Sequence, residues 1–104
     1  MAINYTVGEA FGYGTVSTTV LTLGSFSFTA IQIGNASRMI ATVDSNSILY
    51  RYDNTGGTIT SPQGHLAGAG AVIELLGKTN ISNFQVIRSG GTDATLAITL
   101  ETAP

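Results

Sequence analysis

The spacing of glycine constrains this chain more than any other feature of its sequence. Thirteen of its 104 residues are glycine, and the runs between them are rich in Val, Ile, Thr and Leu. Branched residues of this kind favour strands, and glycine clusters favour turns. The apolar period of 3.6 residues that marks an amphipathic helix is almost absent. The pattern therefore predicts an all-β domain built from many short strands.

We expect seven strands, spaced about 8–12 residues apart. They cover residues 15–23, 26–33, 38–43, 48–52, 71–76, 84–89 and 94–101. In the first two the apolar alternation slips by one residue. We interpret this slip as a bulge in 26–33, and as a bulge or a strand buried on both faces in 15–23. A long connection is expected over 53–70, and one or two helical turns over 78–83.

Such a set of strands closes into a sandwich or a barrel, and no strand is long enough to wrap a barrel. We therefore expect a compact antiparallel β-sandwich of about seven to eight strands. Residues 15–104 form its single domain.

Residues 1–14 are expected to form an extended N-terminal arm, because glycines at positions 8, 12 and 14 interrupt them. One alternative is that the arm adds a strand to a neighbouring copy or to a partner protein. The other is that it forms an eighth strand of its own sandwich. The candidate partner-binding residues are the five sizeable apolar ones: Ile3, Tyr5, Val7, Phe11 and Tyr13.

Charge is scarce, with four cations and six acids giving a net charge of −2. Charged residues make up 10% of the chain, against about 25% in typical domains. No basic stripe is present, so we expect no nucleic-acid partner. No apolar run approaches the roughly 20 residues of a membrane span, and no signal-peptide pattern is visible, so we expect no membrane partner and synthesis in the cytoplasm.

The sequence offers no catalytic constellation, so we expect no enzyme, cofactor or metal site. Cysteine is absent, which excludes thiolate ligands. His65 is the only histidine, and a metal site or a general base would need further groups beside it. We interpret His65 as fixing the loop by a hydrogen bond to backbone. Arg51 is expected to bind loop carbonyls or a carboxylate, and Asp53 to cap the turn that follows.

Tyr50 and Tyr52 share one face of an expected strand. Aromatic rings so placed form either a core stripe or a platform for sugar. A carbohydrate-binding β-sandwich module therefore stays open as an alternative function.

One group of short motifs resembles a known class of proteins. The motifs are Ile48-Leu49-Tyr50-Arg51-Tyr52-Asp53, Ser61-Pro62, Gly64-His65-Leu66, Ile87-Arg88 and Ala94-Thr95-Leu96. In this order they resemble small virion proteins of tailed bacteriophages and prophages, and the match covers roughly residues 38–101. The chain departs from that pattern at Gly56-Gly57, where a proline is common, and in its N-terminal half.

The resemblance implies a non-enzymatic virion structural protein, most like a capsid decoration (cement) protein. Such a protein lies on the capsid exterior, binds the major capsid protein and forms a homo-oligomer, a dimer or trimer. Many weak contacts then add up through multivalency, and a low charge suits an interface made by apolar and backbone groups. A tail, connector or fibre-associated subunit is the alternative within the virion.

Overall fold

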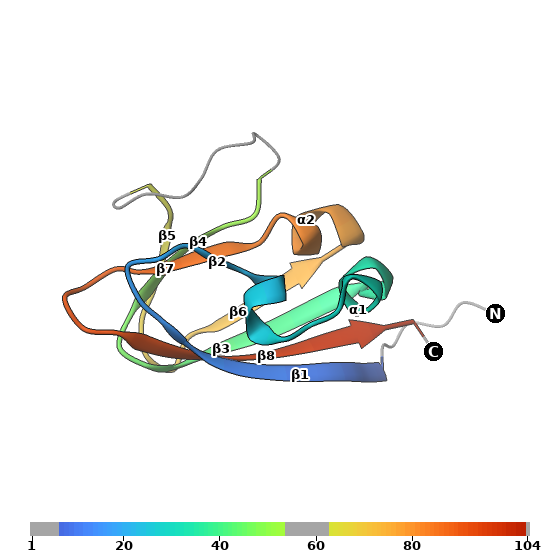
Figure 1. Cartoon of the computed structure of the whole chain (residues 1–104), viewed down its shortest axis with the longest axis horizontal. Coiled ribbons are helices and arrows are strands. Elements are labelled where there is room, and N and C mark those ends of the chain that lie inside the picture. The colour runs from blue at the N-terminus through green and yellow to red at the C-terminus, as the bar shows by residue number, and fades with distance from the viewer. Residues whose placement is uncertain (1–6, 54–62, 104) are drawn as a thin grey trace.

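Two four-stranded antiparallel sheets lie face to face in the computed structural model of this chain, which describes residues 7–53 and 63–103 (Figure 1). The first sheet has the order β1 (Val7–Val16), β8 (Ala94–Thr102), β3 (Arg38–Ser45), β6 (Val72–Leu76). The second has the order β2 (Leu21–Thr22), β7 (Gln85–Arg88), β4 (Ile48–Arg51), β5 (His65–Ala67). The expected all-β sandwich of about eight strands is confirmed.

Strict alternation along β3 and β8 builds the centre of the core. In register, Met39 lies opposite Leu100, and Ala41 lies opposite Ile98. These side chains are fully buried, because every second residue of a strand faces the same side of its sheet. Full burial of each large apolar side chain contributes about 1.5–3 kcal/mol. The second sheet and the segments beside it supply the opposing layer, chiefly Ile48, Phe84 and Val86.

Two short α-helices contact each other at one end of the sandwich: α1 (Ala30–Asn35) and α2 (Lys78–Ser82) (Figure 1). The helical turn expected over 78–83 is thus confirmed as α2, which buries Ile81 completely. The strands expected over 38–43, 48–52, 71–76, 84–89 and 94–101 are also present.

The strand expected over 26–33 is wrong. The structure has a 3-10 helix, η1 (Leu23–Phe26), followed by α1. Thr29 begins α1 with a capping box: its hydroxyl accepts from the Gln32 backbone N–H at 3.1 Å, and its own N–H donates to Gln32 Oε1 at 2.9 Å. This local pattern stabilises a helix start. The slip in the apolar alternation is therefore not a bulge. It marks the point where the chain passes from the buried Phe28 into α1, on which Ile31 is 76% exposed.

The expected boundaries of the N-terminal region and of the long connection also need correction. The expected strand 15–23 is divided in the structure. Its first two residues end β1, which closes at Val16, and β2 consists of Leu21–Thr22 alone. From Val7 onward the expected arm is a strand of its own sandwich, paired with β8 along its length. Ile3 and Tyr5 lie outside the described residues. The expected connection 53–70 contains β5.

Two glycines of β1, Gly12 and Gly14, are packing residues. A Cβ atom on Gly12 would lie 2.8 Å from the Phe26 carbonyl oxygen and 2.9 Å from the Phe28 ring. A Cβ atom on Gly14 would lie 2.9 Å from the Phe26 ring. Glycine inside a strand commonly marks such a close approach. The two positions form a flat shelf on which Phe26 and Phe28 close one side of the core.

We expect Gly12→Ala to lower the free energy of unfolding by about 1–3 kcal/mol, because the added methyl group overpacks a contact with backbone. Gly14→Ala should act in the same direction. Urea unfolding followed by circular dichroism measures the change.

Gly8→Ala is the matched control on the same strand, since a Cβ atom there would meet only the Thr99 methyl group, at an ordinary 3.9 Å. It should change stability by less than about 0.5 kcal/mol. Equal effects at positions 8 and 12 would contradict the shelf.

Candidate interaction surface

The alternation that fills the core leaves the other side of the first sheet facing solvent. We call this side the outer face. Its large apolar side chains lie on the two outermost strands: Phe11 and Tyr13 on β1, 67% and 55% exposed, and Val72 and Leu76 on β6, 64% and 60% exposed. These are four of the eight large apolar residues that are exposed in the described part of the chain. Between them lie Arg38, Ile40, Thr42, Asp44, Thr95, Ala97, Thr99 and Glu101.

The middle of the outer face carries no charge. One cross-strand row runs through Tyr13, Ala97, Thr42 and Val72 in register. The next row begins with Phe11 and reaches an ionisable group only at Glu74 on β6. A flat surface of Thr, Ala and aromatic groups loses little hydration energy when a partner covers it.

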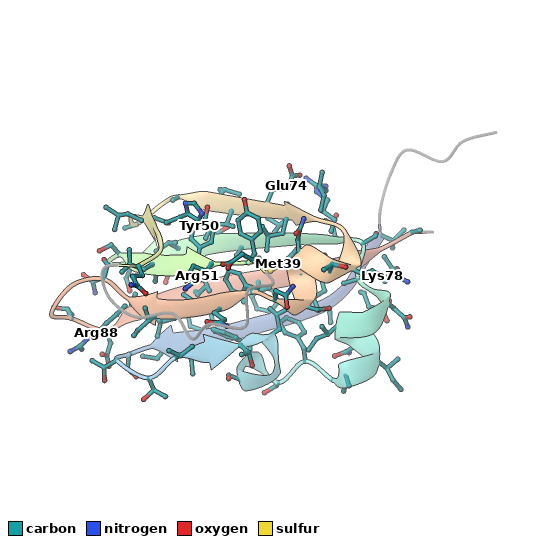
Figure 2. The ribbon with its side chains drawn as sticks, turned by 90° about the horizontal axis from the view of Figure 1, so that it is seen from above. Met39, Tyr50, Arg51, Glu74, Lys78 and Arg88 are labelled. Carbon is teal, nitrogen blue, oxygen red and sulfur yellow. The ribbon has the colours of Figure 1, made fainter. Side chains whose placement is uncertain are left out.

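The charges on this face lie at its margins and have partners within the chain. Arg38 contacts Glu74 at 2.7 Å and Glu101 at 3.2 Å; Figure 2 shows Glu74 on β6, at the edge of the first sheet. The hydrogen bond that Arg38 donates to Glu74 and the nearby charge of Glu101 raise the pKa of the Arg38 guanidinium. At the other end of β3, Asp44 accepts hydrogen bonds from Tyr13, at 2.9 Å, and from Thr95, at 3.3 Å. In the row through Tyr13, Ala97, Thr42 and Val72, no charge has to lose hydration when a partner binds.

Sequence reasoning found half of this surface. Of the candidate partner-binding residues, the structure places Phe11 and Tyr13 on the outer face. Val7 is 46% exposed at the start of β1. The exposed residues of β6 were missed, because 71–76 reads as one apolar run. Glu74 was the available signal: it marks the solvent side of β6, which Val72 and Leu76 share with it.

A second cluster lies on the other sheet, where β4 meets β5. His65 pairs in register with Tyr50, and its ring lies 5.4 Å from the Tyr50 ring and 6.0 Å from the Tyr52 ring. His65 is therefore a strand residue in an aromatic cluster, where a loop residue bonded to backbone was expected. Tyr50 also contacts Phe84, at 6.2 Å between ring centres, and packs against the core.

Arg51 and Asp53 form a two-pronged ion pair beside that cluster. The Arg51 Nε and Nη2 groups each donate to a different oxygen of Asp53 at 2.8 Å. This hydrogen bonding raises the pKa of the Arg51 guanidinium. With Gln63, Gly64 and His65 the pair lines an open depression of about 570 Å³. The pair spans the end of β4, where the sequence places a transition from strand to loop.

No group of three or more His, Asp or Glu side chains in the described ranges is placed to hold a metal ion. Within those ranges no helix is long and apolar enough to cross a membrane. Comparisons with protein-family models, with curated proteins and with solved structures found no match to this chain.

We expect Arg51→Ala to lower the melting temperature of the isolated protein, because Asp53 loses both hydrogen bonds at the end of β4. Arg51→Lys should restore only part of the loss, since an ammonium group cannot reproduce the planar two-pronged geometry. Lys78→Ala, which removes a cation from α2, is the control for net charge.

Differential scanning calorimetry measures all three variants. An unchanged melting temperature for Arg51→Ala, together with lost capsid binding, would instead place Arg51 in an interface.

Proposed function

We propose that this protein is a non-enzymatic virion structural protein of a tailed phage or prophage, which decorates the capsid exterior by binding the major capsid protein. The motifs shared with small phage virion proteins support the virion context. The outer face supports the mode of action, which is binding by surface contact. No step of this proposal requires a cofactor or a bound metal.

The observation that carries the proposal is the combination of exposed apolar groups and paired charges on the outer face. Phe11, Tyr13, Val72 and Leu76 expose large apolar side chains on one sheet surface. Clustered apolar groups on a protein surface mark interaction sites. The charged groups at the margins already have partners, so a partner needs to provide mainly shape and apolar contact.

A repeated capsid lattice suits a surface that binds each capsid subunit only modestly. A decoration protein binds many equivalent sites, and copies that touch one another bind more tightly than each would alone. One outer face can therefore bind modestly and still give full occupancy of a capsid. The same reasoning places the outer face against the capsid subunit in this proposal.

The double variant Thr42→Lys, Val72→Lys tests this arrangement. Both positions lie in one uncharged row, opposite each other in register on β3 and β6. Buried against a capsid subunit, the new ammonium groups would lose hydration without a partner. We expect binding to weaken by at least about tenfold, which is about 1.4 kcal/mol. The measurement is co-sedimentation with capsids of the phage or prophage that carries the gene, prepared without this protein.

Ile31→Lys is the matched control, because Ile31 is 76% exposed on α1, outside the outer face. It should bind as the unmodified protein does, and circular dichroism should show all variants folded. Failure of the unmodified protein to bind such capsids would overturn the decoration role. Binding that survives the double variant and fails with Ile31→Lys would move the interface to the helical end of the sandwich.

A carbohydrate-binding module is the second candidate, favoured by the cluster of Tyr50, Tyr52 and His65. The Tyr50 and Tyr52 rings are stacked, with centres 6.3 Å apart. Tyr52 is 36% exposed, and the depression next to it has the polar rim that sugar hydroxyl groups require.

Tyr52→Ala tests this candidate better than Tyr50→Ala. Tyr50 packs on the core, so its removal should lower the free energy of unfolding by about 0.5–3 kcal/mol whatever it binds. Tyr52→Ala should leave the fold intact. A glycan array read with the unmodified protein and with Tyr52→Ala decides: we expect no glycan signal from either. A signal that Tyr52→Ala removes would replace the decoration role by carbohydrate binding.

A further inference from the structure

We propose that two copies of this chain associate through the open edges of their β1 strands, antiparallel and centred on Tyr13. The two first sheets then continue across a twofold axis as one eight-stranded sheet. This inference rests on the edge geometry of the sandwich and does not depend on the proposed virion role.

The edges of the two sheets differ sharply in length. In the described part of the chain, β1 pairs on one side only, with β8. It has 10 residues, while the other edge strands have 5 (β6), 3 (β5) and 2 (β2). Short strands and charged side chains protect edges from pairing with other chains, and β6 has Glu74 at its centre. Neither device protects most of β1.

The bulge in β1 defines which part of the edge is regular. The register with β8 shifts between Gly8 and Ala10, which leaves Glu9 as the extra residue. Residues 10–16 then pair without interruption and contain no charge and no proline. The one acidic side chain of β1, Glu9, is thus confined to the irregular end.

Residues 10–16 match a second copy of themselves. An antiparallel ladder centred on Tyr13 uses all seven residues and sets Tyr13 against its own counterpart. Phe11 of each copy then lies opposite Thr15 of the other, on the outer face. On the inner side, Gly12 lies opposite Gly14, and these two residues add no side chain of their own beside the Phe26 and Phe28 rings that cover them in each copy. No like charges face each other anywhere in this ladder.

The size of the contact predicts a weak dimer. Seven antiparallel residues form a ladder about 24 Å long. The ladder with its flanking side chains falls at the low end of specific interfaces, below about 1,200 Å² in total. Association should therefore depend on concentration between about 1 μM and about 1 mM.

Paired charge variants test the edge. In the double variant Phe11→Lys, Thr15→Lys, each introduced lysine faces a lysine of the other copy across the proposed ladder. Sedimentation velocity should therefore show a monomer at all protein concentrations between about 1 μM and about 1 mM. In Phe11→Lys, Thr15→Glu, each introduced lysine faces a glutamate of the other copy, and the dimer should return. Within one copy the two positions are about 13 Å apart along the strand, so the rescue has to act between copies.

Single cysteines test the register, since the chain has no cysteine of its own. Only Tyr13→Cys brings a position directly opposite itself, within the Cα separation of about 4.4–6.8 Å that a disulfide allows. It should form a covalent dimer under mild oxidation, while Phe11→Cys, Thr15→Cys and Val72→Cys stay largely monomeric. Non-reducing electrophoresis measures the products.

Three outcomes would overturn the inference. The first is that the unmodified protein stays monomeric at about 1 mM. If the double variant Phe11→Lys, Thr15→Lys then also loses capsid binding, the β1 edge binds the capsid subunit and not a second copy. The second is a dimer that survives Phe11→Lys, Thr15→Lys, which would place the interface elsewhere. The third is cross-linking of Phe11→Cys or Thr15→Cys in preference to Tyr13→Cys, which would refute the register.

Discussion

The contact between the glycine shelf of β1 and the rings of Phe26 and Phe28 is the constraint on which much of this structure depends. It brings η1 directly against the strand and closes the core at Gly12 and Gly14, where β1 has no side chain of its own. Over residues 10–16 the inner side of β1 otherwise carries Ala10 and the fully buried Val16. The large groups in the middle of the strand, Phe11 and Tyr13, lie on its solvent side, because the Phe26 and Phe28 rings fill the space over the two glycines.

The scarcity of charged side chains determines the character of both surfaces that we propose for binding. The outer face is uncharged at its centre because Thr and Ala alternate with the core residues of β3 and β8. Its charged groups are used within the chain, Arg38 with two carboxylates and Asp44 with two hydroxyl groups. Under our proposals, a protein with four cations that are largely paired in this way recognises partners by shape, apolar contact and backbone pairing.

The outer face and the β1 edge meet at Phe11 and Tyr13 but serve different geometries. A face accepts a partner stacked on the sheet, whereas an edge accepts a strand in the plane of the sheet. Both can be occupied at once, so pairing of copies and binding to a larger surface do not compete. A dimer extended in this way doubles the area of outer face offered to a repeated lattice, which strengthens binding by multivalency.

The sequence by itself determined the class of fold and the strands at its centre. The alternation in 38–43 and 94–101 is local, and burial of one side of each strand follows from it alone. The tertiary structure decided what the glycines of β1 do, because their reason is a contact with Phe26 and Phe28, residues distant in the chain. A local signal for α1 (Ala30–Asn35) was also present in the sequence, because the capping pair Thr29 and Gln32 prevailed there over an apolar run that resembled a strand. Finally, the tertiary structure decided that His65 belongs to a strand, because only pairing with Tyr50 holds it there.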